Sequence, residues 1–365
     1  MFGRRLFIAF GLLAAIGCSK SSPTTDAQGS AATAPAPAAA QDISLNGAGA
    51  TFPYPLYSKW MAEYNKLHTN VRINYQSIGS GGGIRQISAG TVDFGASDAP
   101  MKDEEAKGAT GKLLHIPTTI GSVVVSYNLE GVTTPLKLTP EVLSGIFLGD
   151  IKKWNDKRLA EVNAGVALPN KDISVVYRTD GSGTTHVFTE YLAAVSPGWK
   201  EKVGAGKSVK WPVGLGAKGN EGVTGQLKST PGTIGYVELA YANQSKLPKA
   251  ELKNRAGNFI APSPEAATAA AEGLDMPDSL HGSLADAAGD KSYPLASYTY
   301  MLVYEDAKDP VKGAALARFL WWATHEGQKH AAELDYAPLP AKVITKIEER
   351  LRGLRAGDKK LLDGV

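Results

Sequence analysis

Residues 43–60 read ISLNGAGATFPYPLYSKW, and this stretch holds a strand, a loop and the start of a helix. Ile43 to Leu45 is predicted to form a short strand. Pro55 to Leu67 is predicted to form a helix, because its large apolar side chains recur at helical spacing. The Gly-rich segment Gly47 to Pro53 lies between them. A strand that leads through glycines into a helix is typical of α/β proteins.

Strand and helix patterns alternate through the rest of the chain. The predicted strands are 71–78, 92–96, 123–127, 173–177, 234–237 and 298–303, and the predicted helices are 84–89, 140–147, 187–195, 311–323 and 342–354. This alternation predicts an α/β fold with a mostly parallel sheet. The 365 residues suffice for two or three domains. Two smaller α/β lobes are favoured on size grounds, and a single doubly wound sheet is the alternative.

The composition excludes several classes of protein. Hydrophobic residues make up 43% and charged residues 21%, which is typical of a globular chain. The net charge of +3 comes without blocks of Lys and Arg, so we expect no nucleic-acid binding. The single Cys and six scattered His exclude an intrachain disulfide framework and a Cys-rich zinc site. We expect no metal.

Residues 1–17 are predicted to be an export signal peptide. Arg4 and Arg5 precede an apolar run of 11 residues, Leu6 to Ile16. That run is too short to cross a bilayer core of about 30 Å as a helix. The paired arginines also faintly resemble a twin-arginine signal, although any export signal needs a positive start.

The segment Ala15-Ile16-Gly17-Cys18 resembles a bacterial lipobox, in which the cysteine becomes the lipidated N-terminus. Residues 19–40 are rich in Ser, Thr, Ala and Pro, so we expect residues 18–40 to be a lipidated Cys and a flexible linker. The alternative is a plain signal peptide cut after Ala40. The protein is therefore expected in the periplasm or as a lipoprotein anchored to a membrane, where ATP and NAD are scarce. We expect no cofactor.

Three polar loops share the layout of the opening stretch. Each follows a predicted strand, is rich in glycine and hydroxyl residues, and opens a predicted helix; they are Gly47–Pro53, Gly79–Gly83 and Asp180–Thr185. Glycine lets the backbone approach a ligand, and the free N–H groups at a helix start favour an anion. One such loop is commonly only a helix cap. Three of them predict a small-anion site if they meet at the carboxyl edge of the sheets.

The type of anion is indicated by what flanks these loops. No Lys follows the glycines, and no G-x-G-x-x-G precedes an acidic residue, so nucleotide motifs are absent from the sequence. Arg178 supplies a guanidinium fork that suits a tetrahedral oxyanion. Asp98 closes a predicted strand. A carboxylate beside an anion is repulsive unless the anion has a proton to donate, which phosphate has near neutral pH and sulfate lacks.

These residues resemble the phosphate-binding proteins of high-affinity phosphate ABC transporters. The resemblance covers nearly everything from Leu45 to about Pro340, and it rests on six segments in the family's order: Gly47–Pro53, Gly79–Gly83, Asp93–Pro100, Arg178–Thr184, Trp211–Gly219 and Pro231–Val237. It implies a type II periplasmic-binding-protein fold of two α/β lobes joined by two crossovers, with the ligand in the interlobe cleft. The tail from about Ile344 does not match well.

The resemblance implies the residues that bind phosphate, which are Thr51, Phe52, Ser80, Asp98, Arg178, Ser182, Gly183 and Thr184. Thr51 and Phe52 are expected to bind through backbone N–H groups, Arg178 through its guanidinium, and Asp98 by accepting the proton of phosphate. Asp180 is expected to pair with Arg178. Gly81 departs from the family, which often has a second Ser there.

The resemblance also implies the lobes and the partners. Lobe 1 is expected to comprise 41–119 and 295–365, and lobe 2 to comprise 120–294. The partners implied are inorganic phosphate and the permease and ATPase subunits of the transporter, with the protein itself a monomer. The implied function is extracytoplasmic capture of phosphate and delivery to the permease, without enzymatic activity.

The main alternative is a secreted phosphate-ester hydrolase that uses Ser182 and His186, which are four residues apart at a helix start. The surrounding sequence is not G-x-S-x-G, so the nucleophile elbow is absent from it. His325 and His330 are five apart and do not share one helical face, which disfavours a metal site there.

Overall fold

The computed structural model describes residues 41–362. The predicted signal peptide, Cys18 and the predicted linker lie outside the described residues. The strands are β1 Ile43–Gly49, β2 Val71–Ser77, β3 Phe94–Ser97, β4 Leu113–Tyr127, β5 Lys137–Leu138, β6 Ser174–Arg178, β7 Leu215–Ala217, β8 Thr233–Glu238, β9 Glu251–Lys253, β10 Phe259–Ile260, β11 Ala296–Tyr304, β12 Arg355–Ala356 and β13 Lys359–Lys360.

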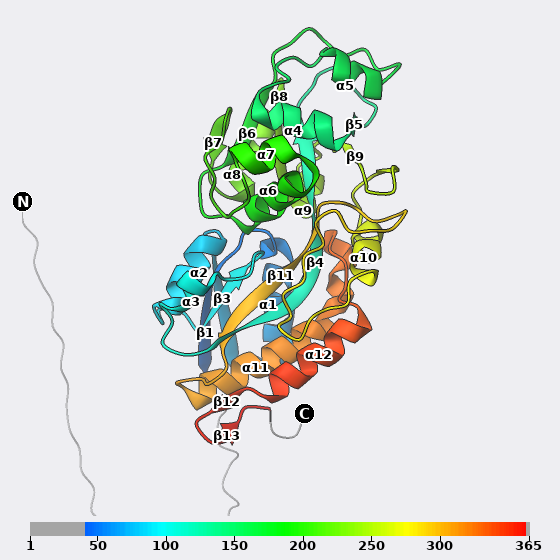
Figure 1. Cartoon of the computed structure of the whole chain (residues 1–365). Coiled ribbons are helices and arrows are strands. Elements are labelled where there is room, and N and C mark those ends of the chain that lie inside the picture. The colour runs from blue at the N-terminus through cyan, green and yellow to red at the C-terminus, as the bar shows by residue number, and fades with distance from the viewer. Residues whose placement is uncertain (1–40, 363–365) are drawn as a thin grey trace, which may run out of the picture. The chain divides into compact units, whose positions relative to one another are not determined.

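The helices alternate with these strands (Figure 1). They are α1 Tyr54–Leu67, α2 Ser80–Ser88, α3 Asp103–Ala106, α4 Pro140–Leu148, α5 Lys157–Val162, α6 Gly183–Val195, α7 Pro197–Lys202, α8 Gly219–Ser229, α9 Leu239–Gln244, α10 Pro264–Glu272, α11 Pro310–Thr324 and α12 Ala341–Arg352, with two 3₁₀ turns at Glu326–His330 and Ala332–Leu334. The predicted α/β class is confirmed.

Eight strands form one connected ladder in the order β2-β1-β3-β11-β4-β8-β6-β7. Strands β1, β2 and β3 pair in parallel, as do β6, β7 and β8. The middle of the ladder is antiparallel, because β11 pairs antiparallel with β3 and β4, and β4 pairs antiparallel with β8. The expectation of a mostly parallel sheet therefore holds for the two ends of the ladder and is wrong for its middle.

Strand β4 joins the two ends of the ladder. Its first part, Leu113–Ser122, pairs with β11, and its last part, Val123–Tyr127, pairs with β8. In Figure 1, β4 runs from the strands around β11 to the strands around β6 and β8. The predicted strand covered only Val123–Tyr127, because the first part contains Pro117 and two Thr and lacks a continuous apolar run. The lobe boundaries at 119/120 and 294/295 stay a prediction.

Two helices begin four residues earlier than predicted, and both begin at the polar loops. Helix α2 starts at Ser80 rather than at Ile84, and α6 starts at Gly183 rather than at Val187. The missed residues are Ser and Gly in α2 and Gly, Thr and His in α6, which are weaker helix formers than Ala or Leu, so the pattern placed each start at the first apolar residue. Tertiary packing overrides this preference, since Gly81, Gly82 and Gly83 are all buried.

The core contains three fully buried tryptophans, Trp60, Trp154 and Trp199. The indole N–H of each donates to a backbone carbonyl: Trp60 to Gly327 at 2.7 Å, Trp154 to Gly232 at 3.1 Å, and Trp199 to Gly204 at 2.9 Å. A buried indole needs such an acceptor, because an unpaired polar group in the core is costly.

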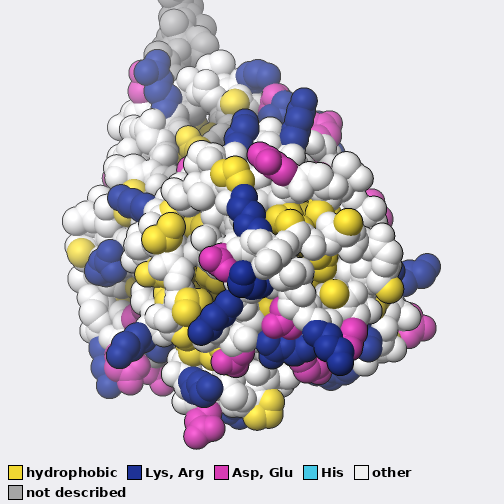
Figure 2. Space-filling view, turned by 90° about the horizontal axis from the view of Figure 1, so that it is seen from above, with side chains coloured by type: hydrophobic (Ala, Val, Ile, Leu, Met, Phe, Trp, Pro, Cys, Tyr) yellow, Lys and Arg dark blue, Asp and Glu magenta, His cyan; other side chains and the backbone are white. Residues whose placement is uncertain are grey.

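On the face shown in Figure 2, charges of both signs are mixed. Figure 2 shows one face of the molecule, on which Lys and Arg side chains are interspersed with Asp and Glu. In residues 41–362, no helix combines the length and the apolar character needed to cross a membrane.

The close packing of α2 on the sheet generates a testable prediction. A Cβ on Gly83 would lie 2.5 Å from the Cα of Gly49 and 2.6 Å from the carbonyl oxygen of Ala48, and neither backbone atom can move freely. We expect Gly83→Ala to lower the free energy of unfolding by about 1–3 kcal/mol, measured by chemical denaturation.

The matched control is Gly225→Ala in the exposed part of α8, where a Cβ would meet no atom within 4 Å. Because Ala is the better helix former, this change is expected to raise the free energy of unfolding by about 0.5–1 kcal/mol. An unchanged or higher stability of Gly83→Ala would contradict the packing argument.

Candidate anion-binding site

The loop between β1 and α1 holds its backbone in one fixed orientation. Each carbonyl of residues 50–52 accepts a hydrogen bond from a tyrosine hydroxyl, at 2.8, 2.6 and 2.7 Å; the donors are, in order, Tyr75, Tyr241 and Tyr336. The C=O and N–H of a trans peptide point in opposite directions. The N–H groups of Thr51 and Phe52 therefore point away from the tyrosines, and neither donates to another group within residues 41–362.

Burial keeps these hydroxyls protonated. It raises the pKa of Tyr75 and of Tyr336 well above the ordinary value for tyrosine, with nearby acidic side chains adding to the effect. Both are therefore hydrogen-bond donors at any physiological pH. The neutral tyrosine hydroxyls behind the loop thus hold its carbonyls, and this fixes the direction of the N–H groups of Thr51 and Phe52.

Ser80 and Asp98 lie side by side, at the start of α2 and just past the end of β3. Both are buried, and the Ser80 hydroxyl lies 3.3 Å from Oδ2 of Asp98. The other carboxylate oxygen, Oδ1, accepts a 2.8 Å hydrogen bond from the hydroxyl of Thr299 on β11. Asp98 is thereby held in place by two hydroxyl groups, at the point where β3 ends.

The carboxyl of Asp98 is readily protonated for an aspartate. Burial raises its pKa from 3.8 to about 7, against the opposing effects of the Thr299 hydrogen bond, the charge of Arg178 and the Ser80 hydrogen bond. Desolvation disfavours the charged form of a carboxylate, and only a partner that stabilises the anion can reverse this. A proton donor placed beside Asp98 would be such a partner.

Arg178, at the end of β6, is buried and paired with Asp180. Its Nε donates to Oδ1 of Asp180 at 2.8 Å, and its Nη2 donates to Oδ2 at 2.5 Å. Burial alone would raise the pKa of Asp180, but the hydrogen bonds and charge of Arg178 outweigh it and hold that pKa below its ordinary value. The N–H of Gly219 also donates to Asp180, at 3.0 Å. The pair therefore contributes little net charge. Nη1 of Arg178 does not bind Asp180 and instead points toward the Thr184 hydroxyl, 3.4 Å away.

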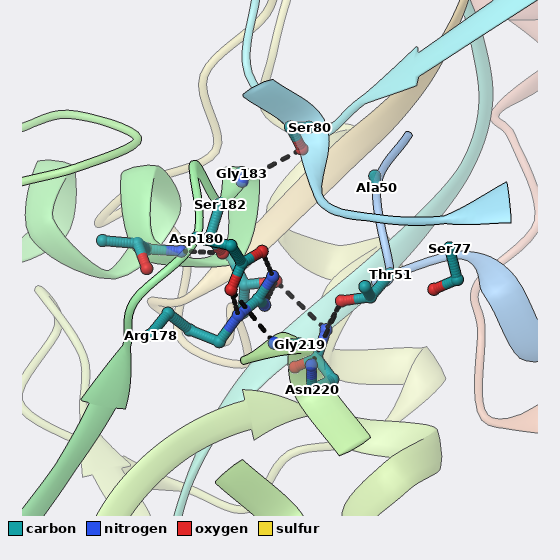
Figure 3. A network of polar contacts seen from close by, with 12 residues as sticks. Ala50, Thr51, Ser77, Ser80, Arg178, Asp180, Ser182, Gly183, Gly219 and Asn220 are labelled. Carbon is teal, nitrogen blue, oxygen red and sulfur yellow. Dashed lines mark hydrogen bonds and ion pairs between the residues drawn. The ribbon is translucent and has the colours of Figure 1, made fainter. Parts of the chain in front are cut away.

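Ser182, Gly183 and Thr184 form the start of α6. The Ser182 hydroxyl accepts from the N–H of Thr185 at 3.0 Å, so Ser182 is an N-cap. The N–H of Gly183 donates to the Ser80 hydroxyl at 3.0 Å (Figure 3). A Cβ on Gly183 would lie 2.4 Å from Oδ2 of Asp98, so the absence of a side chain lets the two loops meet.

The structure brings the eight predicted site residues together from both ends of the ladder. Gly81 N–H donates to the carbonyl of Gly181 at 2.8 Å, which links the second loop to the third. In Figure 3, Thr51, Ser80, Arg178 and Gly183 surround one polar centre. A Cβ on Gly81 would lie 3.2 Å from the Cα of Gly181, so the two glycines pack closely where the loops meet.

Several residues of this network were missed by the sequence interpretation. Asn220, in the first turn of α8, contacts both Thr51 and Thr184. The others are Thr299, Gly219 and the tyrosines at 75, 241 and 336. The segment Trp211–Gly219 was noted only for its resemblance, and the strand–Gly–Asn start of α8 would have been the local signal for Asn220.

In the part of the chain that the structure describes, the histidines considered for a hydrolase or a metal site do not form such a site. The backbone N–H of His186 donates to the carbonyl of Ser182, and among the described residues no hydrogen bond joins the imidazole of His186 to the Ser182 hydroxyl. His325 stacks on Trp321 and lies 3.3 Å from Glu348. Within residues 41–362, no group of three His, Cys, Asp or Glu side chains is placed to hold a metal ion.

The comparisons with known proteins first define the class of the protein. Residues 24–326 match the family model described as a PBP superfamily domain. A solved phosphate-binding protein from Stenotrophomonas maltophilia has a TM-score of 0.66 at 19% identity, covering 84% of this chain and 93% of that one. An ABC-type phosphate transport receptor from Vibrio cholerae has a TM-score of 0.53 at 18% identity, covering 81% and 100%. The fold is the α/β fold of periplasmic binding proteins.

The sequence relatives define the family. The phosphate-binding protein PstS of Pasteurella multocida is 48% identical over 326 residues, which cover 88% of this chain and 94% of that protein. The chain belongs to the family of phosphate-binding proteins PstS.

The raised pKa of Asp98 predicts a pH-dependent stability. A carboxyl whose pKa is higher in the folded protein than in the unfolded chain stabilises the fold when it is protonated. That stabilisation is complete below the unfolded pKa of about 4 and is lost as the pH rises through about 7. In phosphate-free buffer, the free energy of unfolding of the wild type is therefore expected to fall by up to about 4 kcal/mol between pH 4 and pH 8 because of Asp98.

The comparison variant is Asp98→Asn, whose amide does not titrate. Other buried carboxyls, Glu238 among them, are the same in both proteins and cancel in the difference. The measurement is urea denaturation of both proteins across this pH range. Parallel stability curves would show that Asp98 is not the titrating group.

Proposed function

We propose that this protein captures inorganic phosphate in the site formed by Thr51, Phe52, Ser80, Asp98, Arg178, Ser182, Gly183 and Thr184, with Asp180 pairing with Arg178. The observation that carries the proposal is the placement of one buried carboxylate, Asp98, among N–H groups, hydroxyls and a guanidinium. Such a site suits an anion that also carries a proton. Family membership supports the same ligand.

The donors and the acceptor have separate roles in this proposal. The N–H groups of Thr51 and Phe52, the loop hydroxyls and the guanidinium of Arg178 bind phosphate oxygens. Asp98 accepts the hydrogen bond of the protonated oxygen, which is charge-assisted and therefore strong. Sulfate has no proton at neutral pH. Its oxygen and the carboxylate oxygen of Asp98 would then be two acceptors without a donor between them, and their negative charges would repel. Arsenate carries protons as phosphate does and would be accepted.

The protein acts as the substrate-binding component of a phosphate ABC transporter, without enzymatic activity. Its permease and ATPase subunits are the partners. Lobe 1, comprising 41–119 and 295–365, and lobe 2, comprising 120–294, would close on phosphate, and the protein would act as a monomer. Cys18 would carry a lipid that anchors it to a membrane, with residues 19–40 as the tether.

The binding test is calorimetric titration with phosphate, sulfate and arsenate at one pH and one salt concentration. Wild type is expected to bind phosphate and arsenate and to exclude sulfate. Asp98→Asn replaces the acceptor by a donor, so we expect it to gain measurable sulfate affinity and keep some phosphate affinity. Arg178→Ala is expected to weaken phosphate binding by about 2–5 kcal/mol, since it truncates a buried charged partner.

Wild type that binds sulfate as well as phosphate would refute the role of Asp98. Phosphate binding by Arg178→Ala at wild-type affinity would refute the site. The hydrolase alternative predicts turnover of a phosphomonoester that is lost in Ser182→Ala, and such turnover would replace the binding-protein assignment.

The lipid anchor is tested by Cys18→Ala with metabolic labelling by a radioactive fatty acid. Wild type is expected to carry the label and to fractionate with membranes. The variant is expected to lack the label and either to be released or to accumulate uncut. Equal labelling of both proteins would contradict the lipobox assignment. With flexible-coil statistics of about 5–6 Å × √n, the tether would reach roughly 25 Å on average.

A further inference from the structure

Asn220 is a fully buried amide that lies between two of the proposed phosphate ligands. It belongs to the first turn of α8, and its Nδ2 lies 2.8 Å from the Thr51 hydroxyl and 3.3 Å from the Thr184 hydroxyl. Its Oδ1 accepts a 3.0 Å hydrogen bond from the N–H of Glu238. A backbone N–H can only donate, so the end of the amide that faces Glu238 must be the oxygen. The NH₂ end therefore faces the two hydroxyls.

The Thr51 hydroxyl receives two hydrogen bonds from this one residue. Its oxygen accepts from Nδ2 of Asn220 at 2.8 Å and from the backbone N–H of Asn220 at 3.2 Å (Figure 3). A hydroxyl oxygen has two lone pairs and carries one proton. Both lone pairs are used by Asn220, so the hydroxyl of Thr51 can engage a further group only as a donor.

The Thr184 hydroxyl is in the same situation. Its oxygen accepts from Nδ2 of Asn220 at 3.3 Å and from Nη1 of Arg178 at 3.4 Å. These two bonds are longer, but both partners are pure donors. The proton of Thr184 is therefore also left for a third group.

We propose that Asn220 is a positioning residue that forces the hydroxyls of Thr51 and Thr184 to act as hydrogen-bond donors toward the bound anion. The inference rests on the proposed function, because it takes Thr51 and Thr184 as phosphate ligands. A hydroxyl can otherwise rotate to offer a lone pair, which would repel a phosphate oxygen. Asn220 removes that choice for both hydroxyls at once, and it does so across elements from opposite ends of the ladder, β1–α1 and α6.

The amide is the group that can perform this role without adding charge. Its two N–H bonds match the two hydroxyls, and its oxygen satisfies the buried N–H of Glu238. A carboxylate of the same shape would still accept from Glu238. Its second oxygen, however, would attract both hydroxyl protons away from the anion.

The test is a double-mutant cycle on the phosphate dissociation constant. Asn220→Asp is expected to weaken phosphate binding by about 100-fold or more, since two donors to an anion are redirected. The same substitution is then made with Thr51→Val and Thr184→Val together, which keep the side-chain shapes but remove both hydroxyls. In that background we expect Asn220→Asp to weaken phosphate binding by less than about tenfold, because only the charge repulsion between the new carboxylate and phosphate remains.

The inference would be overturned if Asn220→Asp weakened phosphate binding by the same factor in the wild-type and double-valine backgrounds. Charge or misfolding would then explain the whole effect. A second variant keeps the test open if Asn220→Asp does not fold. Asn220→Ala frees the hydroxyl protons without attracting them, so we expect a loss of about tenfold in the wild-type background and a smaller loss in the double-valine background. Equal losses in the two backgrounds would again contradict the proposal.

Asn163→Asp is the matched control for a buried Asn. Its amide donates to the carbonyls of Lys137 and Leu159, both at 2.9 Å, and it contacts none of the proposed ligands. We expect its phosphate affinity to stay within about twofold of wild type, although its stability should fall. Wild type that binds no phosphate would refute the proposed function, whereas normal binding with an additive cycle would refute only the role of Asn220.

Discussion

The ion pair of Arg178 and Asp180 is the interaction on which the rest of the site depends. A guanidinium that is almost fully buried requires a partner, because an unpaired charge in the interior costs several kcal/mol. Asp180 satisfies it with two hydrogen bonds and is itself tied to the N–H of Gly219. The pair thus joins the end of β6 to the start of α8, and it requires Gly79, where a Cβ would lie 2.3 Å from the carboxylate.

Around that pair, the donors of the site are fixed by groups packed behind them. The tyrosine hydroxyls hold the carbonyls of residues 50–52, and Asn220 holds two threonine hydroxyls. Dipoles that are oriented in advance cost no reorganisation when an anion binds, and a low dielectric makes each of them more effective. Asp98 is the counterpart of these donors, since its buried carboxyl gains most from a ligand that brings a proton.

The placement of the candidate site residues at helix starts was predictable from the sequence where the signal is local. A strand, a run of glycines and hydroxyl residues, and a helix start occur within about ten residues of one another, so Thr51, Ser80 and Gly183 could be placed on loops at helix starts. The pairing of Arg178 with Asp180 also spans only two positions. The starts of α2 and α6 were placed four residues late, because the polar residues and glycines before the first apolar side chain give no helical pattern. In α2, the turn is buried against β1 and β3, where Gly83 packs on Gly49 and Ala96.

The sequence by itself determined the α/β class, the three polar loops and the residue types that would suit a protonated anion, because these depend on spacing along the chain and on the chemistry of single side chains. Only the tertiary structure decided which loops meet and which groups orient them. Thr299 reaches Asp98 from 201 positions away, and Tyr336 reaches Phe52 from 284 positions away. No local pattern encodes such contacts. They exist because β4 pairs with β11 along one part and with β8 along the other, which brings distant segments to one buried centre.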